Sequence, residues 1–204
     1  MDKSNLYILK YVKAGKAGKV LSLNREMISE FQTQDCLAIK PYLNKADRTK
    51  DAFIVIGESM AREGVFTGDL LLVSACAVNE LRYGDFLILK VDKNRLEQFF
   101  KTNQDLGFKM RKFLLIADMT KSLNELFEQV KDIDETSRYL DAARETLGKK
   151  FKQAKSELLE EQNTLLSVTY TEKGMDYSFH RIMDLYAKVD SIYREECGQY
   201  KAIK

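Results

Sequence analysis

The chain has 204 residues, of which 45% are hydrophobic, so it is long enough to build a substantial core in one domain with an appendage. Its 33 basic residues nearly balance its 31 acidic ones, which argues against an overall positive charge that would attract nucleic acid. No apolar run approaches the roughly 18 residues that a membrane span needs. The three cysteines are widely spaced and form no Cys-x-x-Cys pair, which favours reduced thiols in a cytoplasmic protein.

Residues 1–50 are expected to form a basic N-terminal arm, with ten Lys or Arg against five Asp or Glu. The alternating segment from Leu6 to Lys13 predicts a strand, and the small residues and lysines of 13–19 predict an exposed loop. The positive charge fits contact with an acidic partner, or simply a solvated surface. No pair of apolar-periodic helices precedes residue 50, so a helix-turn-helix and direct sequence-specific DNA binding are not expected.

Residues 51–118 contain short apolar runs that predict a β domain. Three runs bounded by Gly and Asp have the pattern of buried strands: Phe53–Ile56, Leu70–Val73 and Phe86–Leu89. Residues 95–101 and 108–116 read as two further strands that form a hairpin. Five or more strands joined by Gly-Asp turns predict a small, mostly antiparallel, barrel-like sheet.

Residues 119–204 change to a helical pattern. Ser122-Leu123-Asn124-Glu125 matches a capping box, and apolar residues then recur every seven positions at 126, 133, 140 and 147. Apolar residues between Phe179 and Tyr193 fit one face of a last helix. The expected fold is therefore α+β, with the β domain followed by a C-terminal helical hairpin or small bundle.

Ser59 is the candidate nucleophile, because it follows the first apolar run directly in the turn Gly57-Glu58-Ser59-Met60. The end of a rigid strand is where a positioned nucleophile belongs, although a serine hydroxyl also needs an adjacent base. The alternative is a small residue that fills a tight turn. Asp69 and Asp85 each follow a glycine and are interpreted as turn-forming residues, not as a catalytic pair.

The sequence offers no clear metal or cofactor site. His180 is the only histidine, and it has no Cys or carboxylate at metal-ligand spacing. No glycine-rich phosphate loop with its lysine is present. We therefore expect no metal and no cofactor.

The order Gly57-x-Ser59-Met60, Gly64-x-x-x-Gly68-Asp69 and Gly84-Asp85 resembles the serine–lysine self-cleaving family (peptidase S24) of LexA, UmuD and phage repressors. The resemblance covers about residues 5–116 and leaves the predicted helices unexplained. It implies that Ser59 is the nucleophile and that Met60, Gly68 and Asp69 form its turn motif.

The resemblance also implies a self-cleavage segment, Leu6 to Gly15, with Ala14-Gly15 as the scissile bond. The alternative is a loop rich in lysine and glycine, and the spacer to Ser59 is longer than the family's usual one. The chain starts at this segment, so it resembles UmuD in lacking an N-terminal DNA-binding domain.

The catalytic base of that family is a lysine that burial keeps neutral. Counting along the strand after Val91-Asp92, the family's lysine position falls on Gln98, which cannot usefully accept the proton of a serine. Lys93 or Lys101 could replace it after a register shift. Lys101 would need a bulge, because a three-residue shift turns its side chain to the other face of the strand.

Three functions follow from the resemblance. The first is a regulatory or stress-response protein that acts by protein interaction, with impaired self-cleavage, as a homodimer that docks on the RecA filament or a DNA polymerase. The second is an active peptidase that cuts at Ala14-Gly15. The third is a phage or mobile-element antirepressor that mimics the repressor domain and binds its partners, the repressor included.

Overall fold

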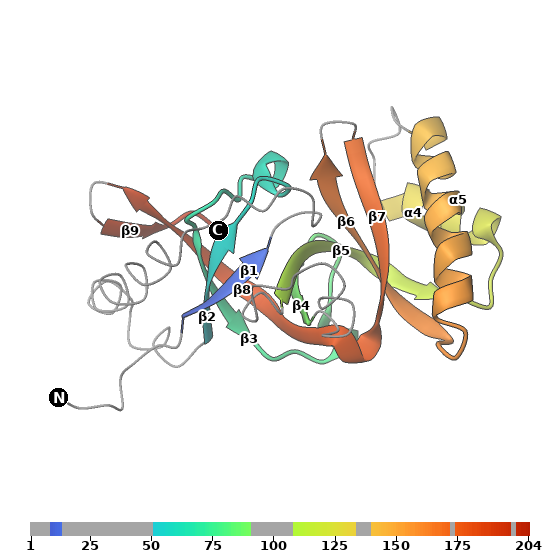
Figure 1. Cartoon of the computed structure of the whole chain (residues 1–204), viewed down its shortest axis with the longest axis horizontal. Helices are drawn as coiled ribbons and strands as arrows, with labels where there is room; N and C mark the ends of the chain where they lie inside the picture. The colour runs from blue at the N-terminus through green and yellow to red at the C-terminus, as the bar shows by residue number, and fades with distance from the viewer. Residues whose placement is uncertain (1–8, 14–50, 91–107, 134–139, 172–173, 197–198) are drawn as a thin grey trace, which may run out of the picture.

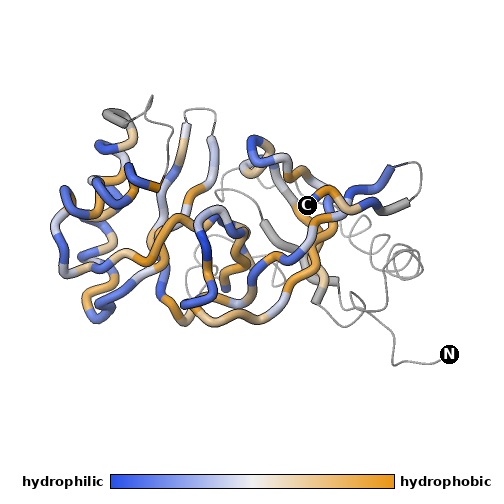
Figure 2. The backbone as a smooth tube through the Cα atoms, turned by 180° about the vertical axis from the view of Figure 1, so that it is seen from behind, coloured by the Kyte–Doolittle hydropathy of each residue, from blue (hydrophilic) through white to orange (hydrophobic). Residues whose placement is uncertain are grey.

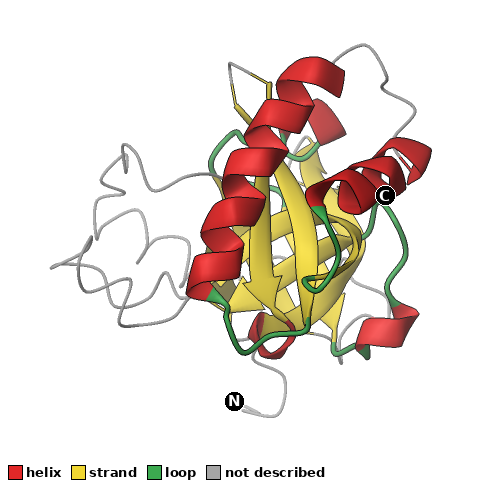
Figure 3. Cartoon of the chain, turned by 90° about the vertical axis from the view of Figure 1, so that its right-hand side faces the viewer, coloured by secondary structure: helices red, strands yellow, loops and turns green. Residues whose placement is uncertain are grey.

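The structure is a computed structural model that describes residues 9–13, 51–90, 108–133, 140–171, 174–196 and 199–204. In these ranges, nine strands form one mostly antiparallel sheet that curls into a half-barrel (Figure 1). Two helices lie against one face of the sheet (Figure 3). The predicted antiparallel, barrel-like architecture is confirmed at this level.

Five of the strands precede the helices: β1 (Leu9–Lys13), β2 (Asp51–Ile56), β3 (Leu70–Ser74), β4 (Phe86–Lys90) and β5 (Phe108–Asp118). The strands β2 to β5 coincide with runs after residue 50 that the sequence predicts as strands, and β1 lies within the predicted strand of residues 6–13. β1 runs parallel to β2, whereas β2 with β3 and β4 with β5 pair antiparallel. The apolar runs of β3 and β4 are buried almost throughout, which explains why they do not alternate with polar residues.

The helices α4 (Leu123–Ile133) and α5 (Leu140–Glu157) lie in the middle of the chain. After them come four more strands: β6 (Asn163–Thr171), β7 (Gly174–Arg181), β8 (Leu185–Glu196) and β9 (Gln199–Ala202). The sheet order is β1-β2-β3-β8-β4-β5-β6-β7, with β9 paired to β8. β8 therefore sits between β3 and β4, and the C-terminal residues complete the same sheet.

The predicted C-terminal helical hairpin is wrong in its position, because both helices precede residue 158. The last helix expected over residues 179–193 is instead β7, a 3₁₀ turn and β8. The apolar spacing there fits a helix, but the segment is rich in aromatic and β-branched residues that favour strands. The strand is favoured over the helix because β7 pairs with β6 along its whole length except for the first residue of β6.

Two large clusters make up most of the hydrophobic core, and Figure 2 shows the hydrophobic residues along the strands in orange. One fills the half-barrel and contains Phe53, Met60 and Met110. The other lies between the sheet and the helices and contains Leu126 and Leu147, two of the apolar residues that recur every seven positions. The heptad pattern of α4 and α5 thus marks the face that they bury on the sheet.

The capping box predicted at the start of α4 is confirmed. The Ser122 backbone N–H donates to Glu125 Oε2 at 2.8 Å, and the Glu125 backbone N–H donates to Ser122 Oγ at 3.3 Å. These two bonds satisfy backbone donors that a helix start otherwise leaves without partners.

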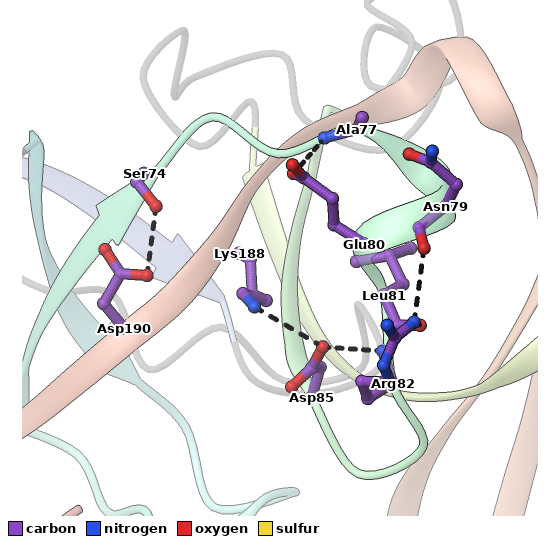
Figure 4. Close-up of polar contacts among 9 residues, drawn as sticks. All are labelled: Ser74, Ala77, Asn79, Glu80, Leu81, Arg82, Asp85, Lys188 and Asp190. Atoms are coloured by element: carbon purple, nitrogen blue, oxygen red, sulfur yellow. Dashed lines mark hydrogen bonds and ion pairs between the residues drawn. The ribbon is translucent and has the colours of Figure 1, made fainter.

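The connection between β3 and β4 is fastened to β8 by polar contacts (Figure 4). Asp85 accepts a hydrogen bond from the Arg82 backbone N–H at 2.8 Å, and Lys188 Nζ lies 3.8 Å from the same carboxylate oxygen. Ser74 Oγ donates to Asp190 at 3.0 Å. Asp85 therefore has the turn-forming role that the sequence predicts.

Candidate functional site

Ser59 lies in the turn between β2 and the short 3₁₀ helix η4 (Ala61–Glu63). Its backbone carbonyl accepts a hydrogen bond from the Tyr170 N–H of β6 at 2.9 Å. The next residue, Met60, is fully buried in the core of the half-barrel. The backbone on both sides of the serine is thus held, as expected for a residue that must keep one position.

The rest of the turn is closed by bonds around its two flanking glycines. Gly57 and Gly68 have φ angles of 106° and 94°, a left-handed backbone that other residues rarely adopt. The Gly57 N–H donates to Thr67 Oγ1 at 2.9 Å, and the Gly68 N–H donates to the Val55 carbonyl at 2.9 Å. The Gly-x-Ser-Met and Gly-Asp elements of the sequence therefore build one loop.

Asp69 anchors this loop to β8. Its carboxylate is 2% exposed and receives two hydrogen bonds from the Arg194 guanidinium, at 2.8 and 2.7 Å. Arg194 also donates to the Gly64 carbonyl at 2.8 Å, and its guanidinium lies over the Phe66 ring. The bonds to Asp69 raise the pKa of Arg194. Asp69 is thus a structural anchor of the Ser59 turn.

The Ser59 hydroxyl oxygen is buried, and it has no hydrogen-bond partner in the part of the chain that the structure describes. Buried hydroxyls are normally bonded, so an unpaired one at the expected nucleophile position calls for an explanation. A base poised to take the proton of this serine would lie within about 3 Å of the hydroxyl. No described residue does so.

A polar cluster of three residues lies beside the turn. Lys112 of β5 donates to Glu63 Oε1 at 2.7 Å, and the Tyr170 hydroxyl donates to the same oxygen. The Lys112 and Glu63 side chains are 15% and 19% exposed, so the ion pair is largely shielded from water. Tyr170 links this cluster to the serine, because its backbone N–H bonds the Ser59 carbonyl.

The pKa of Glu63 reflects this cluster. Burial works to raise the pKa of the carboxyl group, but the hydrogen bonds from Lys112 and Tyr170 outweigh it and hold the pKa below its ordinary value. Glu63 is therefore a carboxylate at neutral pH, and its partner Lys112 is engaged as a donor.

The other residues of the expected site lie outside the described part of the chain. They are the family lysine position Gln98, the alternative bases Lys93 and Lys101, and the cleavage residues Ala14 and Gly15. Of the predicted site residues, the structure brings together Ser59, Met60, Gly68 and Asp69.

Lys112 is a residue that sequence reasoning missed. Counting forward from Val91 led to Gln98, whereas in the structure β4 pairs with β5, and Phe86 lies directly opposite Lys112. Counting across this hairpin from Gly84-Asp85 would have placed Lys112 level with the start of β4. The signal was a break in alternation: in Phe108-Lys109-Met110-Arg111-Lys112, a lysine takes the position where an apolar residue would continue the pattern.

The described residues offer no metal site, since no group of three or more His, Cys, Asp or Glu among them could hold a metal ion. His180 lies on β7, not on a helix, and its Nε2 is 3.1 Å from Ser167 Oγ. None of the described helices has the length and apolar character needed to cross a bilayer.

Comparison with models of protein families, with curated proteins and with solved structures finds no match for this chain.

Proposed function

We propose that the chain is a LexA/UmuD-like regulatory protein that acts by binding other proteins and whose self-cleavage is impaired. The observation that carries the proposal is the Ser59 hydroxyl, which is buried without a base bonded to it among the described residues. A serine that lacks its base loses most of its reactivity, even where oxyanion donors remain. The turn around it is nevertheless held by hydrogen bonds of its backbone to Tyr170 and Thr67, as suits a docking scaffold.

Lys112 supports the same reading. An amine must present a free lone pair to take the proton of a serine. An ammonium group that donates to Glu63 at 2.7 Å presents none. The hydrogen bond to Glu63 therefore engages Lys112 as a donor, which opposes its use as a base.

An active self-cleaving peptidase is the second candidate, and the position of Lys112 beside the Ser59 turn favours it. If Lys112 left Glu63 and turned towards Ser59, the pair would have the composition of a serine–lysine dyad. The expected cut would then fall between Ala14 and Gly15.

The test is the mass of the purified protein after prolonged incubation at alkaline pH, where lysines lose their charge. We expect the mass to stay unchanged. A peptide ending at Ala14 that disappears in Ser59→Ala and Lys112→Ala, but persists in the control Lys152→Ala, would overturn impaired cleavage and identify Lys112 as the base. The same assay on Gln98→Lys tests the position read from the sequence, because cleavage gained there would place the family lysine at residue 98.

The proposed partners are tested with purified components. We expect a homodimer by light scattering and binding to the RecA filament or to a damage-tolerant DNA polymerase. Binding to a repressor alone would instead identify an antirepressor. Duplex DNA serves as the negative control, since no direct sequence-specific DNA binding is proposed.

A further inference from the structure

An open pocket of about 260 Å³ lies between α5, β7 and the strands β4 and β5. It is on the other side of β5 from the Ser59 turn, because Arg111 lines the pocket while the next residue, Lys112, bonds Glu63. Neighbouring residues of a strand point to opposite faces, so the pocket and the turn are separate sites.

The pocket is strongly basic. Five side chains that are cationic at neutral pH line it, with two carboxylates and the single histidine: Lys90, Lys109, Arg111, Lys150, Arg181, Glu157, Asp184 and His180. The excess of three positive charges is concentrated in a chain that carries a formal net charge of only +2. A concave surface of one sign attracts ligands of the opposite charge.

Arg111 distinguishes this pocket from an ordinary basic surface. Its side chain is 3% exposed, and one terminal nitrogen donates to the Met110 carbonyl at 2.8 Å. Its Nε is buried and has no partner among the described residues. A guanidinium presents five donors in a fixed fork, and the Met110 carbonyl takes one of those of Arg111, so the side chain retains donors for an anion in the pocket that it lines.

The charge of Arg111 is only partly compensated. Asp176 attracts it, but Lys150 shares that carboxylate at a distance of 3.4 Å. Burial outweighs the attraction and lowers the pKa of Arg111 to about 10, so the group is still a cation at neutral pH. A buried cation of this kind gains from a bound anion.

Two of the remaining cations are exposed and form the rim of the pocket. Lys90 is exposed and lies over the Tyr186 ring, and Arg181 is exposed with Glu161 at 3.6 Å. These weak, solvent-screened contacts leave both side chains able to turn towards an anion. The pocket therefore combines a buried guanidinium with two exposed cations at its rim.

We propose that this pocket binds a small phosphate monoester, with its phosphoryl oxygens on Arg111 and the rim lysine and arginine. Guanidinium groups match phosphate in geometry and form strong, charge-assisted hydrogen bonds with it. The volume of about 260 Å³ is just below the ~300 Å³ at which drug-sized ligand pockets begin, which suits a small molecule. Leu158 and Phe179, which line the pocket and are partly buried, offer apolar contact to its organic part.

The experiment is calorimetric titration of the full chain with phenyl phosphate, and with inorganic phosphate, at constant ionic strength. We expect saturable binding of phenyl phosphate. Arg111→Gln should weaken it about tenfold or more, the loss of one charge-assisted hydrogen bond. Because a buried substitution can impair folding, the exposed rim variants Lys90→Gln and Arg181→Gln are decisive, and each should weaken binding several-fold. The control is Lys152→Gln. Lys152 lies on α5, which borders the pocket, but it is not one of the lining residues, so this variant should bind as the unmodified chain does.

Four results would overturn the proposal. One is the absence of saturable binding. Another is equal affinity in the chain and in both rim variants. The third is displacement of phenyl phosphate by a single-stranded oligonucleotide with steep salt dependence, which would show a nucleic-acid surface. Tighter binding of inorganic phosphate than of phenyl phosphate would likewise contradict a monoester site. These readouts do not depend on Ser59 or on cleavage.

Discussion

Arg194 of β8 holds the buried carboxylate of Asp69 through two hydrogen bonds, although the residues are 125 positions apart in the sequence. The same guanidinium donates to the Gly64 carbonyl within the Ser59 turn. Strand β8 therefore fixes the loop that carries the candidate nucleophile.

Replacement of Arg194 by alanine is expected to lower the free energy of unfolding by about 2–4 kcal/mol. The substitution leaves the buried Asp69 carboxylate without its partner, and breaking a buried pair is costly. Arg194→Lys keeps the charge but loses the two-pronged geometry, so its loss should be intermediate. Urea denaturation measures both, and a change below about 0.5 kcal/mol in Arg194→Ala would show that the pair does not anchor the loop.

Glu63 should make the free energy of unfolding depend on pH in the acidic range. Its pKa in the folded protein is below its ordinary value of 4.5, so its contribution is fully present above that value and is lost as the pH falls through the folded pKa. The difference in unfolding free energy between the chain and Glu63→Gln should be constant from about pH 6 to 8 and shrink below about pH 4.5. A difference that grows on acidification would contradict the Lys112–Glu63–Tyr170 cluster.

Gly148 of α5 lies close to Leu123 of α4. A Cβ at this position would lie 3.1 Å from Leu123 Cδ2, so the ~1 kcal/mol that alanine offers a helix is opposed by crowding. We expect Gly148→Ala to be nearly neutral alone. In a Leu123→Ala background the same substitution should stabilise by about 1 kcal/mol. Equal effects in both backgrounds, measured by thermal unfolding, would refute the contact.

The contribution of the capping box at the start of α4 to the stability of the fold should be measurable. Ser122→Ala removes the acceptor for the Glu125 N–H and should cost about 1 kcal/mol of stability. Ser122→Thr keeps the hydroxyl, which accepts from the Glu125 N–H and donates to Glu125 Oε2, and should stay close to the unmodified chain. Similar losses in both variants would show that the serine acts through another contact.

The first half of the fold was predictable because its signals are local. Apolar runs bounded by Gly and Asp gave β2, β3 and β4, and the capping box marked α4 at its first turn. The Ser59 turn was predictable for the same reason, since its glycines and Asp69 lie within twelve residues of Gly57.

The second half depends on long-range pairing that spacing does not encode. Residues 179–193 place apolar side chains at intervals that fit a helix, yet β8 inserts between β3 and β4. Arg194 and Lys112 reach the turn only through such pairings. The anchor of the loop and the lysine beside it could therefore not be found by counting along the chain.

The mass of the purified chain after long alkaline incubation tests the central claim most directly. An inert Ser59 predicts a single species at the full 23.6 kDa, in the unmodified chain and in Ser59→Ala alike. Release of a peptide from residue 1 to Ala14, seen in the unmodified chain and absent in Ser59→Ala, would contradict it.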